Sequence, residues 1–198
     1  MSMTGGRSPR DQGNRAERLV AKYLGGERIV GSGAYKFSNK NLVGDVDVWI
    51  GPRPYLKLEV KTTAKTGVNG PVFSLTAKVL DQMQREAEQY NELGCVWIHY
   101  KNNRPENDIT VWPINHLLQF AIEAGMMVRS DNLSYRLEGK KSVRIERNTV
   151  LRELPVGGQF TISVLSCYLN VDGEVRSYAI VSGADVQYAL AAIREKNS

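Results

Sequence analysis

Two short segments of this chain alternate charged and apolar residues in a way that gathers ionisable groups on one face. Residues 45–50 read DVDVWI and residues 56–61 read LKLEVK. Strict alternation is typical of half-buried β-strands, and the GPRP sequence at residues 51–54 is typical of a turn. The pattern therefore predicts a β-hairpin. Its polar face would hold Asp45, Asp47, Lys57, Glu59 and Lys61.

This face could bind a divalent cation. Carboxylates on neighbouring strands repel each other, so they need compensation from Lys57 and Lys61 or from a metal ion. Mg²⁺ is usually held by one or two carboxylates together with water and substrate phosphate. Lys61 follows Glu59 by two residues and shares its face, where an ammonium group can position water or stabilise charge on a phosphate. Taken alone, the same alternation is also typical of an ordinary solvent-facing hairpin.

A helix before the hairpin could supply a further carboxylate. From Asp11 onward, the apolar residues follow the spacing of an amphipathic helix, which the pair Gly25-Gly26 ends. Glu17 lies at the border of the apolar stripe, from which it could reach over the edge of the sheet. A polar loop that contains Ser32 connects this helix to the hairpin.

The elements after the hairpin alternate between helices and strands. Residues 66–71 form a glycine-rich segment predicted as a loop, followed by a helix capped by Ser74 or Thr76 and ending at Gly94. Strands are predicted at 95–100 and 109–113, and Asn115 is predicted to cap a short helix ending at Gly125.

The final third holds short strands around residues 133, 143, 160–169 and 175–181 and a last helix from about residue 184. We expect a flexible tail at 1–10, a core at 11–125, and an α+β extension at 126–198. The extension would complete the core or form a dimer interface.

Four segments occur in an order that resembles a known group of enzymes: GNRAE at 13–17, GSG at 31–33, GDV at 44–46 and EVKT at 59–62. The order resembles the PD-(D/E)xK nuclease superfamily, and within it the archaeal-type and phage-encoded Holliday junction resolvases. The resemblance covers about residues 13–100. It implies an α/β fold with a restriction-endonuclease-like core, in which helices flank a mixed central sheet. It also implies Mg²⁺-dependent DNA hydrolysis, with Mn²⁺ able to substitute.

The resemblance assigns a role to each matching residue. Asp45 would be the central metal ligand, Glu59 the second ligand, Glu17 the helix carboxylate that assists the metal, and Lys61 the catalytic lysine. Ser32 matches a loop residue near the scissile phosphate.

Two departures from the motif bear on the metal ligands. Gly44 stands where the motif has proline, and Asp47 points the same way as Asp45. Asp47 therefore remains an alternative metal ligand. Asp45 is favoured because it follows Gly44 and should lie near the start of its strand.

The resemblance also implies the partners. A resolvase would act as a homodimer on four-way DNA junctions during recombination and repair, since two-fold symmetry matches two symmetric cuts. The alternatives are a restriction- or repair-type nuclease on linear or single-stranded DNA, and a non-catalytic DNA-binding module. The net charge of +5 leans weakly toward nucleic acid. The predicted DNA contacts are Arg15, Lys65, Lys78, Lys140, Lys141 and Arg144.

The remaining reactive side chains are predicted to be structural. His99 lies in an apolar strand, His116 lies at the start of a helix, and Cys95 and Cys167 lie in apolar runs typical of buried thiols. No apolar run approaches the length of a membrane span. We therefore expect an intracellular, cytoplasmic protein, with a phage-encoded protein acting in its host's cytoplasm as one origin.

Overall fold

The predicted hairpin is present in the computed structural model of the chain, as strands β2 and β3 of a larger sheet. The structure describes residues 9–29, 44–64, 66–67, 70–137, 142–146, 161–171 and 174–198. In chain order the elements are α1 (Pro9–Leu24), β1 (Glu27–Arg28), β2 (Val46–Ile50), β3 (Arg53–Thr63), β4 (Thr66–Gly67), β5 (Gly70–Thr76), α2 (Ala77–Gln89), β6 (Leu93–Tyr100), η1 (Pro105–Asn107), β7 (Ile109–Pro113), α3 (Ile114–Ala124), β8 (Met127–Leu137), β9 (Ser142–Glu146), β10 (Thr161–Val171), β11 (Glu174–Ser182) and α4 (Gly183–Lys196).

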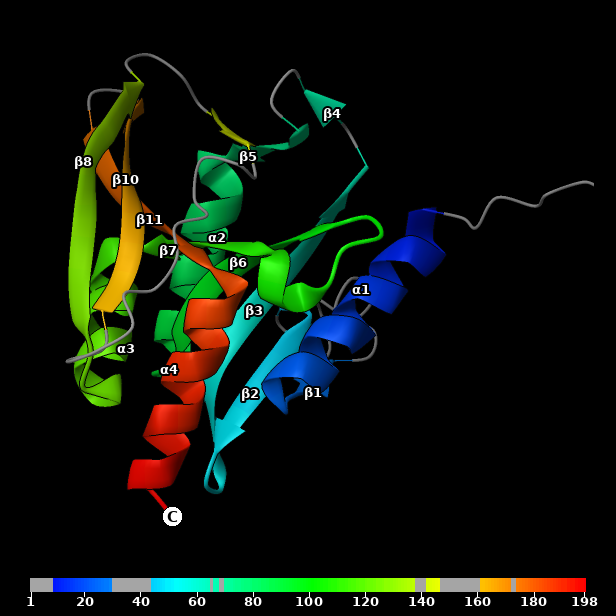
Figure 1. Cartoon of the computed structure of the whole chain (residues 1–198), viewed down its shortest axis with the longest axis vertical. Helices are drawn as coiled ribbons and strands as arrows, with labels where there is room; N and C mark the ends of the chain where they lie inside the picture. Colours follow the sequence, from blue (N-terminus) through cyan, green and yellow to red (C-terminus); the bar gives the residue numbers. More distant parts are fainter. Residues whose placement is uncertain are drawn as a thin grey trace, which may run out of the picture.

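The main sheet has eight strands in the order β1-β2-β3-β6-β7-β11-β10-β8 (Figure 1). The pairs β3–β6 and β8–β10 are parallel, and the other neighbours are antiparallel. Because α2 lies in the connection between the parallel strands β3 and β6, these elements form a βαβ-type crossover. The prediction of a mixed α/β sheet flanked by helices is confirmed.

Helices cover both faces of this sheet. On one face α2 packs Leu80, Met83 and Ala87 into a cluster with residues of β6 and β7. On the other face α1, α3 and α4 share a second cluster with the alternate residues of β3, β6 and β11. Every residue of β6 is buried, as expected for a central strand covered on both faces.

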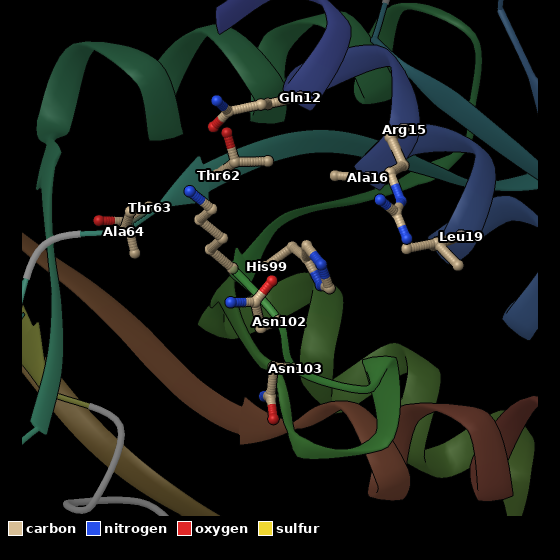
Figure 2. Close-up of a pocket in the computed structure, with 11 residues that line it drawn as sticks. Gln12, Arg15, Ala16, Leu19, Thr62, Thr63, Ala64, His99, Asn102 and Asn103 are labelled. Carbon is tan, nitrogen blue, oxygen red and sulfur yellow. The ribbon is translucent and has the colours of Figure 1, made fainter. Parts of the chain in front are cut away.

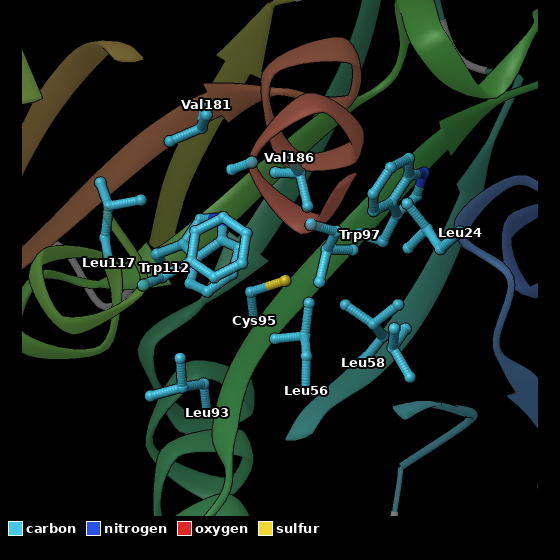
Figure 3. Packing of buried hydrophobic residues seen from close by; sticks show 14 of the residues in the cluster. Leu24, Leu56, Leu58, Leu93, Cys95, Trp97, Trp112, Leu117, Val181 and Val186 are labelled. Atoms are coloured by element: carbon cyan, nitrogen blue, oxygen red, sulfur yellow. The ribbon is translucent and has the colours of Figure 1, made fainter. Parts of the chain in front are cut away.

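The second cluster is built around two tryptophans that are fully buried, Trp97 and Trp112. Figure 3 shows Cys95 between Trp112 and Trp97, with Val186 of α4 beside them. Truncating a buried aromatic of this size typically costs about 3–5 kcal/mol, so this region makes a large contribution to stability. Burial raises the pKa of the Cys95 thiol well above its usual value, which confirms its prediction as a buried thiol.

The C-terminal segment shares this sheet and this core. Strand β11 pairs antiparallel with β7, and Val186, Leu190 and Ile193 of α4 are buried among the core residues. Ser182 caps α4 by accepting a hydrogen bond from the Asp185 backbone N–H at 3.1 Å.

Among the described residues, no helix combines the length and apolar composition that a bilayer crossing requires.

Three local predictions are wrong. Helix α2 ends at Gln89 and not at Gly94, because Asn91 adopts a positive φ of 57° and turns the chain into β6. Gly94 is instead buried in β6, where a Cβ would lie 2.8 Å from the Cβ of Ala87. Asn115 does not cap α3, which begins at Ile114.

The third wrong prediction is the loop at residues 66–71, because this glycine-rich segment contains β4 and the start of β5. Strand β5 pairs with β9 about seventy residues further along the chain.

Candidate active site

Asp45 is fixed at the base of the hairpin by two backbone contacts. Its N–H donates to the Leu58 carbonyl at 2.8 Å, and its carboxylate Oδ2 accepts from the Val60 N–H at 2.8 Å. The antiparallel register pairs Val46 with Leu58, so one residue further it brings Asp45 level with Glu59. The predicted juxtaposition of two carboxylates across the strand pair is therefore present.

Glu59 and Lys61 lie side by side on β3. The Lys61 Nζ donates to the Glu59 Oε1 at 2.5 Å, and the two side chains remain 35% and 25% exposed, Lys61 being the more exposed. Partial exposure keeps both groups accessible to a substrate. The alternation of β3 places them on the sheet face opposite Leu58 and Val60, which belong to the core cluster shared with α1.

Glu17 approaches this pair of strands from α1. Its carboxylate accepts a hydrogen bond from the Arg28 Nε of β1, and the same guanidinium donates to the Asn14 Oδ1 at 2.5 Å. Asn14 precedes Glu17 by three residues, a spacing that shares one side of a helix. Neither Arg28 nor Asn14 was predicted as a site residue, and only the helical spacing of Asn14 could have indicated it.

The pKa of Asp45 is affected by burial and by the charges of the three other predicted residues, Glu59, Glu17 and Lys61. Burial and then the negative charges of Glu59 and Glu17 raise the pKa of Asp45 to about 6, against the hydrogen bond from Val60 and the charge of Lys61, which lower it. A carboxylate that is desolvated and close to two others is costly to ionise. A cation would remove this cost.

Asp47 has a different environment although it shares a face with Asp45. Its Oδ1 lies 2.9 Å from the Lys57 Nζ, which also lies 3.3 Å from the Glu92 Oε2. Lys57 is only 2% exposed and its Nζ lies 5.7 Å from the centre of the Tyr90 ring. Because Asp47 already neutralises a buried lysine, the geometry favours Asp45 as the principal metal ligand of the two.

Gly44 explains the departure from the proline of the motif. It has a φ of 78°, and a Cβ at this position would lie 2.9 Å from the Cγ of Lys57. Proline holds φ near −65°, so it cannot adopt this backbone conformation. Because glycine has no Cβ, the chain can pass close to the Lys57 side chain just before it enters β2.

The predicted DNA contacts are dispersed. Arg15 is exposed on α1 and Lys78 is exposed in the first turn of α2, while Arg144 lies on β9 opposite Ser74. The other predicted residues, Ser32, Lys65, Lys140 and Lys141, lie outside the described residues.

The two histidines differ in their surroundings. His116 is buried and accepts a hydrogen bond from the Gly94 N–H at 3.0 Å, a structural role that ties α3 to β6. His99 is also nearly buried, but it lines a pocket beside α1. Nothing in the sequence around His99 indicated that pocket.

In the part of the chain that the structure describes, no group of three or more His, Cys, Asp or Glu side chains is close enough together to enclose a metal ion. Asp45, Glu59 and Glu17 provide carboxylates of the type that Mg²⁺ prefers, but Glu59 is paired with Lys61 and Glu17 with Arg28. A cation held there would depend on one or two of these carboxylates, with water and substrate supplying its other ligands.

Comparisons with protein-family models, with curated proteins and with solved structures found no match to this chain.

Proposed function

We propose that this protein is a Mg²⁺-dependent DNA endonuclease of the PD-(D/E)xK type. The observation that carries the proposal is the environment of Asp45, whose pKa is raised by burial and by the charges of Glu59 and Glu17 while Lys61 opposes them. Perturbed carboxylates cluster at catalytic sites more often than elsewhere. A hairpin that presents an acid on one strand and Glu-x-Lys on the next fits this reaction class.

The order of the elements supports a restriction-endonuclease-like core. Helix α1 precedes the hairpin β2–β3, and α2 then leads to β6, which lies parallel to β3. We propose that the carboxylate of Glu17, Asp45 immediately before β2 and the Glu59-Lys61 pair on β3 act together. We propose that this core has the restriction-endonuclease-like fold.

Each residue would have a distinct task. Asp45 and Glu59 would hold Mg²⁺ with help from Glu17, and Asp47 would neutralise the buried lysine Lys57. When bound, Mg²⁺ supplies activation of water for in-line attack and neutralisation of charge on the phosphodiester. Lys61 would release Glu59 to the cation and donate to the attacking water or to the phosphate oxygens.

We propose four-way junctions as the substrate and a homodimer as the active form. The support is the resemblance of the motif order to junction resolvases, together with the need for two symmetric cuts. Arg15 and Lys78 are exposed and would contact phosphates, which gives salt-dependent affinity with little sequence information.

The test is a cleavage assay with a matched pair of variants. Labelled four-way junction and linear duplex are incubated with Mg²⁺, Mn²⁺ or EDTA and with wild type, Glu59→Gln or Glu27→Gln. Glu27 is an exposed glutamate on β1, so its variant controls for loss of one surface charge. We expect paired nicks in the junction that require metal, survive in Glu27→Gln, and fall by about 100-fold or more in Glu59→Gln.

Other outcomes change the proposal in defined ways. Equal cutting of linear duplex would retain the nuclease and refute the junction specificity. Tight junction binding without cutting of either DNA would refute the catalytic proposal and leave a DNA-binding module. Cleavage by Glu59→Gln at the wild-type rate would show that the proposed site is wrong.

A further inference from the structure

A pocket of about 350 Å³ lies between α1, the ends of β3 and β6, and the loop that follows β6. Figure 2 shows the side chains of Arg15, His99 and Asn102 around one open space, with Gln12 and Thr62 along its upper side. This volume is in the range of small-molecule sites.

The chemistry of the lining favours an anionic ligand. The pocket is lined by Arg15 and Lys101, by the amides of Gln12, Asn102 and Asn103, and by two threonines, with small apolar surfaces from α1. Among the lining residues in the described part of the chain there is no Asp or Glu. Cationic, amide and hydroxyl groups together can hold a phosphate and also the edge of a heterocycle.

His99 is the most strongly positioned of these groups. Its Nδ1 lies 2.7 Å from the Oδ2 of Asp108, a carboxylate that is fully buried and also accepts from the Trp97 Nε1 at 2.8 Å. A buried carboxylate at Nδ1 fixes the orientation of the ring and directs the other nitrogen, Nε2, away from it. Since the side chain of His99 is 8% exposed and lines the pocket, Nε2 is the edge available to a ligand.

The Asp108 carboxylate is itself held by the fold. The Tyr100 N–H lies 3.3 Å from its Oδ1, and its backbone carbonyl accepts from the Gly183 N–H at 2.9 Å. Because these contacts fix Asp108, its carboxylate can hold the His99 ring in one orientation. The arrangement resembles the way in which buried carboxylates orient functional imidazoles at binding sites.

The pocket shares Arg15 with the proposed DNA contacts but lies on the face of the sheet opposite Glu59 and Lys61. Thr62 follows Lys61 directly on β3, so the two side chains point to opposite faces of the sheet. Thr62 and His99 lie on the face covered by α1, together with Val60 and Trp97 of the core cluster. A ligand there would not need the metal or the carboxylates of the proposed nuclease site.

We propose that this pocket binds a phosphate-bearing nucleotide, with the phosphate held by Arg15 and by an imidazolium of His99 whose Nδ1–H donates to Asp108 and whose Nε2–H donates to the phosphate, and with the base facing the amide of Asn102. The phosphate can belong to a free nucleotide or to a nucleotide within a nucleic-acid strand. These two sources share the same chemistry, and the experiment separates them.

The experiment is a titration of the full chain in EDTA, so that no metal-dependent step contributes. The probes are 2′-deoxyadenosine 5′-monophosphate, deoxyadenosine without phosphate, and a tetradeoxyadenylate strand. Binding is measured by calorimetry and by ¹⁵N NMR of the imidazole rings. The chain has two histidines, and His116, which is bonded to Gly94, serves as the internal reference.

We expect the monophosphate to move the His99 ring signals and not those of His116, and we expect deoxyadenosine to bind at least about tenfold more weakly. Arg15→Gln should weaken binding by about tenfold or more. Arg18→Gln should not, because Arg18 is exposed on the same helix and does not line the pocket. Tighter binding of the strand than of the monophosphate identifies a nucleic-acid subsite, and equal or weaker binding of the strand identifies a free nucleotide.

Three results would overturn the inference: no movement of the His99 signals with any probe, equal binding of deoxyadenosine and the monophosphate, or equal losses in Arg15→Gln and Arg18→Gln. His99→Gln is a second variant for which folding is checked first, because it leaves Asp108 without one of its donors. Glu59→Gln is titrated in parallel. Unchanged binding in that variant would show that the pocket binds its ligand independently of the proposed nuclease site.

Discussion

Replacing Asp45 by asparagine is expected to stabilise the protein at neutral pH while abolishing the proposed cleavage. Asparagine has the shape of aspartate, and its side-chain oxygen can still accept the hydrogen bond from the Val60 N–H. The substitution removes only the charge that burial, Glu59 and Glu17 make unfavourable. A residue retained at a cost in stability is expected where function requires it.

The size of the effect follows from the pKa. In the folded protein the pKa of Asp45 is raised from 3.8 to about 6, and each pKa unit corresponds to about 1.4 kcal/mol. Ionised Asp45 therefore destabilises the folded state by at most about 3 kcal/mol. Because the folded pKa is above the unfolded one, this penalty is fully present above pH 6, shrinks as the pH falls, and is absent below about pH 4.

The assay is urea unfolding in EDTA from pH 4 to pH 8, followed by tryptophan fluorescence. The buried residues Trp97 and Trp112 should report loss of the core. Asp45→Asn should exceed wild type in free energy of unfolding by up to about 3 kcal/mol at pH 7.5, or about 6–12 °C in Tm for a chain of this size. The two proteins should converge near pH 4.

Asp47→Asn is the matched control on the same strand and face. It removes a partner of the buried Lys57, so it should destabilise the protein by about 1–3 kcal/mol, with Glu92 retaining part of the compensation. If Asp45→Asn is no more stable than wild type at pH 7.5, or if its advantage does not change with pH, the electrostatic account of the site is refuted.

Three further substitutions test the fold around the two sites by urea unfolding. Asp108→Asn should lower stability by about 2 kcal/mol, because Oδ2 accepts from Trp97 and His99 and Oδ1 faces the donors of Tyr100 and Asn103, so an amide NH2 in either place would meet donors; an unchanged midpoint would contradict this. Gly44→Ala should cost about 1–2 kcal/mol, since its φ is 78° and its Cβ would meet Lys57; a stabilised variant would contradict the strain. Ser182→Ala should cost about 1 kcal/mol through loss of the α4 cap, and Ser182→Asp should retain it.

The hairpin and the first helix could be predicted because their signals are local. A two-residue period specifies which side chains share a face of a strand, whatever the strand pairs with. This periodicity placed Glu59 and Lys61 together. The register that brings Asp45 level with Glu59 also depends on a β-bulge or irregularity between Val48 and Trp49, which the turn sequence did not predict. Glycines at the end of α1 indicated its C-terminus in the same way.

Strand pairing over long distances could not be predicted. Residues 66–71 were predicted as a glycine-rich loop, but this segment contains β4 and the start of β5, and the partner of β5, β9, comes about seventy residues later. Strand β11 lies between β7 and β10, and no local pattern encodes an insertion of this kind. Such pairings depend on which apolar faces can be buried together, a property of the whole chain.

The sequence favoured Asp45 over Asp47 only through the preceding Gly44, and the tertiary structure supplies a physical reason for that preference. The two aspartates have the same spacing and the same face, but Glu92 comes from the turn before β6 and joins Lys57 in compensating Asp47. Asp45 instead has two carboxylates near it. Sequence determined which residue types share the face of the hairpin. Electrostatics and burial depend on neighbours brought by other elements, so only the folded chain could distinguish a structural aspartate from a candidate metal ligand.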